Sequence, residues 1–296
     1  MQTKTDFLPI KKKRKAVIRP SMVLCYAVLI IVGVVMIFPT VIMITSSLKS
    51  YDEYYSITFT FFPQDPIAGL DNYARIFTAN AQMLRWIGNT LFLIITNIVI
   101  CTTSTLFVAY GFAKFRSKIA DVLFIVLLGT MMIPWAVTMI PSFMIWARLG
   151  LTDTFIPLII PCIGGSAYYV FMFKQNMRGI PNSIVEAAEI DGANSIVRLF
   201  KIIVPNCLPA IVTMVIFSAL GIWGDYLGPL IYLRTPAKFN ISMGLNLMRT
   251  ESNQGKEDTP MLLAASVLMA IPSVVVYFVG TKIFSKGISL QGGVKA

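Results

Sequence analysis

Glu186-Ala187-Ala188-Glu189-Ile190-Asp191-Gly192-Ala193 is a short, polar helical segment, broken by a glycine, between two long apolar runs. Ser183 precedes Glu186 by three residues, the spacing of a capping box, so we expect a helix from about Ile184 to Ile190. Asp191-Gly192 then predicts a turn, because glycine accepts a positive φ that other residues resist.

A second short helix is predicted after this turn, because Asn194 or Ser195 can cap it and Pro205 ends it. Its apolar residues are Ile196, Val197, Leu199 and Phe200. Short isolated helices are marginal in water, so this apolar face either docks on a partner or lies on the bilayer. The residues alone leave both readings open, and Glu186 is also explained as a helix cap without any partner.

The composition is that of a polytopic membrane protein. The chain has 296 residues, of which 56% are hydrophobic and 13% charged, and its mean hydropathy is +0.74; a soluble domain could not bury so much apolar surface. There is no histidine, the commonest metal ligand and general base. The cysteines (Cys25, Cys101, Cys162 and Cys207) have no paired spacing and read as small buried hydrophobes, so we expect neither disulfide nor metal site.

Six apolar runs are long enough to span a bilayer, which takes about 20 residues. They are Met22–Ile44, Trp86–Ala113, Val122–Ala147, Thr154–Phe173, Cys207–Leu233 and Met261–Phe284. The expected fold is therefore an all-α integral membrane protein with one six-helix domain over residues 22–286. The helix–turn–helix lies in its loop 175–205, between the fourth and fifth spans.

Basic residues predict the orientation of these spans. The cationic run Lys11–Lys15 precedes the first span, which is too long for a signal-peptide core. With the N-terminus inside, the cytoplasmic segments hold 17 of the 25 Lys and Arg residues, in agreement with the positive-inside rule. The net charge of +11 thus reflects topology and not a nucleic-acid partner. Residues 1–21 and 287–296 are expected to be cytoplasmic tails.

Two of the spans carry helix breakers. Pro134 and Pro141 predict a kinked or interrupted third span, and Pro157, Pro161 and Gly164-Gly165 do so for the fourth. Broken helices at membrane depth surround a water-filled path or are ordinary kinked packing, and both readings stay open. The second span is rich in polar residues, beginning with Asn89, which we interpret as helix packing rather than ligand contact.

The loop resembles the cytoplasmic EAA motif of binding-protein-dependent ABC importer permeases. The resemblance rests on Glu186-Ala187-Ala188, Asp191-Gly192-Ala193, Phe200, Ile203, Pro205 and Pro209. Further segments resemble the carbohydrate-uptake branch and its maltose-type second permease. They are Leu70-Asp71-Asn72-Tyr73, Asn89-Thr90-Leu91, Ala109–Phe115, Met132-Ile133-Pro134, Ile140-Pro141, Arg148–Leu151 and Gly292–Lys295.

The resemblance implies that the helix pair docks into a groove on a cytoplasmic ATPase subunit and transmits its ATP-driven closure. The implied coupling residues are Glu186, Ala187, Ala188, Asp191, Gly192, Ala193 and Phe200. It also implies a second permease, two ATPase subunits and an extracellular sugar-binding protein as partners, in a prokaryotic cytoplasmic (inner) membrane. ATP and magnesium would bind on the partner subunits, so this chain would hold no cofactor and would be no enzyme.

A candidate substrate path lies in the fifth span, at Trp223-Gly224-Asp225. The family often has Trp-Asn-Asp or Trp-Asn-Glu here, so the glycine puts a sugar contact at position 224 in doubt. An ionisable group such as Asp225 costs roughly 2.5 to 3.5 kcal/mol in lipid, and by default it faces a cavity. Asp225 either accepts hydrogen bonds from sugar hydroxyls or makes a structural bond, with Trp223 beside it.

Two other classes compete with an ABC importer. A self-contained secondary transporter usually needs several intramembrane charges and an internal repeat; here Asp225 alone qualifies and no repeat is visible. A membrane-embedded enzyme lacks support, because Gly255-Lys256 continues with glutamate and has no upstream glycine of a Walker A loop.

Overall fold

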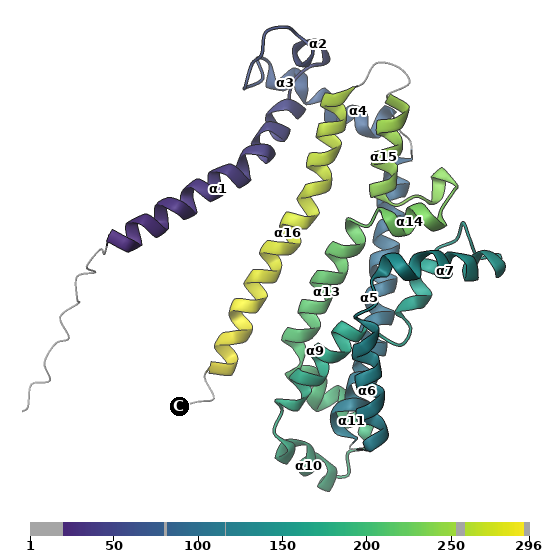
Figure 1. The fold of residues 1–296 in the computed structure, drawn as a ribbon. Helices are drawn as coiled ribbons and strands as arrows, with labels where there is room; N and C mark the ends of the chain where they lie inside the picture. The colour runs from purple at the N-terminus through teal and green to yellow at the C-terminus, as the bar shows by residue number, and fades with distance from the viewer. Residues whose placement is uncertain (1–19, 80–81, 116, 253–257, 293–296) are drawn as a thin grey trace, which may run out of the picture.

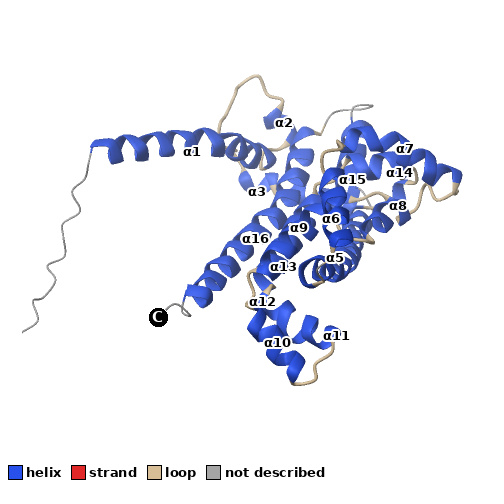
Figure 2. Ribbon diagram, turned by 60° about the horizontal axis from the view of Figure 1, so that its bottom comes forward, coloured by secondary structure: helices blue, strands red, loops and turns tan. Residues whose placement is uncertain are grey.

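The computed structural model describes residues 20–79, 82–115, 117–252 and 258–292, and within these ranges it is helical without a strand (Figures 1 and 2). Four helices are long and apolar enough to cross a membrane, or up to six if two sharply bent pairs each count as one span. The all-helical membrane fold is thus confirmed. The expected number of spans falls at the upper end of that range.

Three of the predicted spans are continuous helices. They are α1 (Pro20–Ser47), α5 (Met83–Lys114) and α16 (Thr259–Gly292). Helix α1 leans away from the bundle and its apolar side chains are almost all exposed, which suits contact with lipid or another chain (Figure 1). Helix α16 continues to Gly292, into the predicted C-terminal tail. Residues 1–19 and 293–296 of the predicted tails lie outside the described residues.

The third predicted span is two helices rather than one. Helices α6 (Lys118–Thr130) and α7 (Trp135–Arg148) meet at 97°, and α7 projects sideways from the bundle in Figure 1. Pro134 stands at the break with extended backbone (ψ 135°) and has no N–H to continue the helix. The expected interruption is confirmed at Pro134, whereas Pro141 lies inside α7 without ending it.

The fourth predicted span is also segmented, although its pieces together, Ile156–Arg178, are one of the four candidate membrane spans. It consists of α8 (Ile156–Ile159), a short 3₁₀ turn η1 (Ile160–Cys162) and α9 (Ala167–Arg178). The gap between the last two contains the glycine pair at 164–165, as the sequence predicts.

The fifth predicted span ends earlier than expected, because α13 (Leu208–Trp223) stops before Asp225 and α14 (Leu227–Tyr232) follows as a separate helix. The prediction of one helix from Cys207 to Leu233 is therefore wrong. Pro229 cannot donate the bond that Asp225 C=O would receive in a continuous helix. The Asn240 side-chain amide donates to that carbonyl instead.

After α14 the chain forms a 3₁₀ turn η3 (Pro236–Lys238) and helix α15 (Ile241–Ser252). Three short helices after α1 lie at the same end of the bundle as α15: α2 (Tyr51–Tyr54), α3 (Pro66–Gly69) and α4 (Asp71–Ala79) (Figure 1).

Two apolar cores hold the bundle together. One lies among α5, α9 and α13, around Phe173, Met177 and Met214, and the other lies nearer α15, around Trp86 and Trp223. The long helices α5, α13 and α16 run side by side along the bundle (Figure 1). Helices α5 and α13 contribute to both cores. This frame separates two ends of the molecule, each with a candidate site.

Candidate functional site

At one end of the bundle the chain forms the predicted helix–turn–helix, α10 (Asn182–Ile190) and α11 (Ser195–Arg198) (Figure 1). The turn has the Schellman pattern: Gly192 N–H donates to Glu189 C=O at 3.0 Å and Ala193 N–H to Ala188 C=O at 2.9 Å. Gly192 has φ +83°, which a side chain would disfavour. The predicted turn at Gly192 is confirmed.

The start of α10 differs from the prediction. The helix begins at Asn182 and has Pro181 at its N-cap, with no side-chain cap bond. Ser183 therefore sits inside the first turn, where its hydroxyl cannot make the expected capping box with Glu186. The carboxylate of Glu186 is exposed and lines a groove instead.

The second helix begins as predicted but ends later. Asn194 Oδ1 accepts from Val197 N–H at 2.9 Å, so Asn194 is the cap. The helix then continues through a π-helical turn η2 (Leu199–Ile203) into α12 (Val204–Asn206), which contains Pro205. The expected stop before Pro205 is wrong, because the proline occupies the first turn of α12, where its missing N–H is not needed.

The helix pair has one anchored face and one uncovered face. Val185, Leu199 and Ile203 are buried in the core against α5 and α9. On the other face Ile190 is 87% and Ile196 62% exposed. Phe200 is 49% exposed, but its ring packs edge-on against Phe107 of α5. Of the predicted coupling residues, Glu186, Ala187, Asp191 and Gly192 are also exposed, while Ala188 and Ala193 are half-buried.

A polar groove of about 400 Å³ joins this helix pair to the end of α5. Arg198 forms an ion pair with Glu189 at 2.6 Å across the two short helices. Lys114 of α5 donates to Asn182 Oδ1 at 3.3 Å. The pair is thus attached to the bundle through the hydrogen bond from Lys114 to Asn182 and the buried residues Val185, Leu199 and Ile203.

At the other end, side chains of α5 bind the backbone of the non-helical segment before α15. Trp86 Nε1 donates to Pro236 C=O at 2.8 Å, and Asn89 Nδ2 donates to the carbonyls of Ala237 and Phe239 at 3.0 and 2.8 Å. For Asn89, the interpretation as packing is confirmed. Irregular backbone in a membrane protein requires such partners, because unsatisfied polar groups are costly there.

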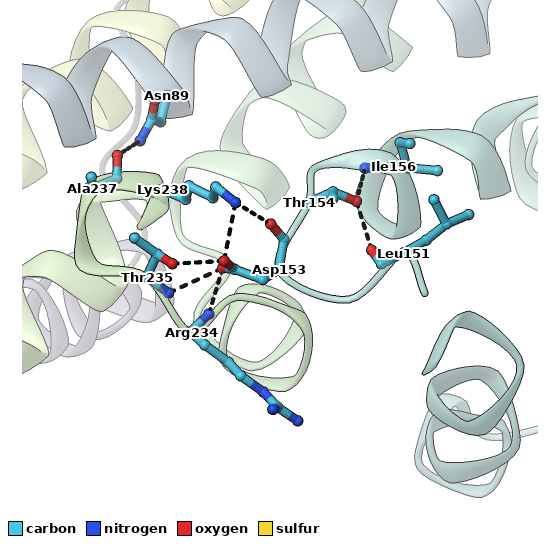
Figure 3. Close-up of polar contacts among 9 residues, drawn as sticks. All are labelled: Asn89, Leu151, Asp153, Thr154, Ile156, Arg234, Thr235, Ala237 and Lys238. Atoms are coloured by element: carbon cyan, nitrogen blue, oxygen red, sulfur yellow. Dashed lines mark hydrogen bonds and ion pairs between the residues drawn. The ribbon is translucent and has the colours of Figure 1, made fainter. Parts of the chain in front are cut away.

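Asp153 clamps the same segment from the opposite side (Figure 3). Its Oδ1 accepts from the N–H groups of Arg234 and Thr235, both at 3.0 Å. Its Oδ2 accepts from the Thr235 hydroxyl at 2.6 Å and from Lys238 Nζ at 3.0 Å. Its own N–H donates to Tyr232 C=O at 2.7 Å.

The environment of Asp153 stabilises its charged form. The hydrogen bond from the Thr235 hydroxyl, followed by those from the two backbone N–H groups and Lys238, lowers the pKa of the Asp153 carboxyl below its usual range. Asp153 also has φ +58°, unusual for a residue with a side chain. Sequence reasoning missed this residue, and an aspartate in the short polar turn after Gly150 was the available signal.

The predicted substrate-path residues lie at the break between α13 and α14. Trp223 is 8% exposed and its Nε1 donates to Met269 C=O at 2.9 Å. Asp225 Oδ1 accepts from Gly228 N–H at 3.1 Å, and a side chain at Gly228 would collide with this carboxylate. No group of three His, Cys, Asp or Glu residues that could hold a metal occurs in the part of the chain that the structure describes.

A bundle of long apolar helices, with broken spans and a helix–turn–helix at one end, has the architecture of an ABC-importer permease. A solved bacterial ABC transporter that imports the acidic polysaccharide alginate contains a chain of this fold: the TM-score is 0.80 at 22% identity, covering 91% of this chain and 100% of that one. The chain belongs to the family described as binding-protein-dependent transport system inner membrane component, whose model matches residues 104–290. The resemblance inferred from the EAA motif is thereby confirmed.

Curated relatives match most of the chain. The arabinooligosaccharides transport system permease protein AraQ of Halalkalibacterium halodurans is 29% identical over 264 residues, 89% of this chain and 93% of that protein. The lactose transport system permease protein LacG of Rhizobium radiobacter is 27% identical over 271 residues, 91% of this chain and 95% of that protein.

Proposed function

We propose that this chain is one of two membrane-spanning subunits of an ATP-driven importer for sugars. Two non-identical permeases would form the translocation path, two separate ATPase subunits would hydrolyse ATP, and an extracellular binding protein would deliver the sugar. Family membership and permease relatives for arabinooligosaccharides and lactose support this proposal.

The observation that carries the coupling role is the uncovered face of α10 and α11. Ile190 and Ile196 project apolar surface from a short element that has no bilayer-length hydrophobic run of its own. Exposed apolar clusters of this kind mark protein contacts. The left-handed turn at Gly192 fixes the angle between the two helices, so a motor subunit bound there could push on α9 and α13 as one unit.

The orientation follows from the same assignment. We place α10, α11 and both termini in the cytoplasm, in agreement with the distribution of basic residues along the sequence. We count α6 with α7 as one span and α13 as another, beside the four other candidate spans, which gives six. ATP and magnesium belong to the partner subunits, so this chain carries no cofactor and no catalytic residue. We further propose that the break at Trp223 and Asp225 borders the sugar path.

ATP-dependent uptake in proteoliposomes tests this proposal. The chain is purified from its native membrane with its associated subunits, reconstituted, and supplied with binding protein and labelled arabinotriose or lactose. We expect accumulation of at least one sugar that requires ATP inside the vesicles and survives ionophores. Accumulation that is abolished by ionophores and independent of ATP would instead establish a secondary transporter.

A further inference from the structure

A second groove lies beside the helix break, between α15 and α16. Its volume is about 280 Å³. It is lined by Tyr226 just after the break, by Ser242, Leu245, Asn246 and the cationic Arg249 of α15, and by Leu262, Ser266 and Met269 of α16. Ligand pockets commonly measure about 300 to 1,000 Å³, so this groove is small and suits a ligand group no larger than about one sugar ring.

The floor of the groove is held by internal hydrogen bonds. Ser242 Oγ donates to Trp223 C=O at 3.1 Å, and Trp223 Nε1 donates to Met269 C=O at 2.9 Å. The indole N–H is therefore already used inside the chain. Trp223 thus holds Ser242 and Met269 in place, and the residues that line the groove make the polar contacts with a ligand.

The lining suits the mixed chemistry of a sugar ring. Asn246 is exposed, and its amide makes no hydrogen bond among the described residues, which leaves donors and an acceptor for hydroxyl groups. Ser266 Oγ donates to Leu262 C=O at 2.9 Å and keeps its lone pairs as acceptors. The ring of Tyr226 and the side chain of Met269 offer apolar surface to the C–H face of a sugar.

We propose that this groove is a sugar-binding subsite on this subunit, in which Asn246 and Ser266 bind the hydroxyl groups of one sugar ring. The inference rests on the proposed import function. Helix α15, which lines the groove, lies at the end of the bundle opposite α10 (Figure 1). In the proposed orientation this is the outer side, where a sugar arrives from the binding protein.

Protection of an engineered thiol tests binding directly. Leu245 lines the groove, so Leu245→Cys is placed in the complete complex together with Cys25→Ser, because Cys25 is exposed. We expect the imported sugar, at saturating concentration, to slow modification by a maleimide. Thr250→Cys, on the same helix but outside the groove, is the control and should be labelled at one rate with or without sugar. Unchanged labelling at position 245 overturns the subsite.

Transport kinetics supply an independent reading. Asn246→Ala should raise the KM for uptake about tenfold with little change in maximal rate, because hydrogen bonds to the bound ring are lost. Ser266→Ala should raise KM less, and Ser273→Ala, the same substitution on the same helix away from the groove, should leave it unchanged. An unaltered KM in both Asn246→Ala and Ser266→Ala contradicts the subsite while import itself stands. Failure of wild-type ATP-driven uptake would instead refute the import function.

Discussion

The two ends of this molecule are stabilised in different ways. The segment 232–241 is tied down from both sides, by Asp153 on one and by Trp86 and Asn89 on the other. The helix pair α10–α11 is held by three buried apolar residues and by a hydrogen bond from Lys114 of α5, and it leaves Ile190 87% exposed. The first arrangement suits a fixed framework around a helix break, and the second suits a surface completed by a partner.

The largest effect is expected at the turn of the helix pair. Gly192→Pro should abolish ATP-driven uptake while the chain still inserts in the membrane, because proline holds φ near −65° and the turn requires +83°. Gly192→Asn is the matched control and should keep most uptake, since asparagine tolerates the left-handed region. Uptake and membrane content are measured together for each variant. Normal uptake by the proline variant would refute the coupling role of this turn.

A smaller effect is expected at the clamp. Asp153→Ala should lower stability by about 2 kcal/mol, because it removes the acceptor for several hydrogen bonds of a charged group. Asp153→Asn should cost less, since the amide oxygen can still accept from the Arg234 and Thr235 N–H groups and asparagine tolerates φ +58°. Thermal unfolding in detergent gives the ranking. Equal melting temperatures for the wild type and both variants would show that the Asp153 hydrogen bonds do not stabilise the fold.

The smallest effect concerns pH. The Asp153 pKa is lowered in the folded protein, first by the Thr235 hydroxyl, so its contribution to stability is fully present above its ordinary pKa of about 3.9 and is lost as the pH falls through the lower folded value. The difference in melting temperature between wild type and Asp153→Asn should therefore stay constant from neutral pH to about pH 5. This difference in melting temperature should shrink below about pH 4. A difference that is already absent near neutral pH would contradict a stabilising role for the Asp153 carboxylate.

Among the turn, the helix break and the clamp, the sequence predicted the structure correctly where the contacts join neighbouring residues, and it failed where they join residues far apart along the chain. The turn at Gly192 depends on neighbouring residues, so local rules located it correctly. The break before Asp225 depends on Pro229, four residues later, and on Asn240, whose amide satisfies the exposed carbonyl. The clamp joins Asp153 to Thr235, more than 80 residues away. No local pattern specifies such a partner, and only the fold brings the two together.

We expect the uncovered face of α10–α11 to contact the ATPase subunit. Photo-cross-linking in the purified complex tests it directly, with a photoreactive residue at Ile196 and, as a control, at Phe59, which is 84% exposed and lies between α2 and α3. We predict an adduct with the ATPase from position 196 and none from position 59. Adducts of equal yield from both positions, or none from position 196 in a complex that imports sugar, would contradict the account.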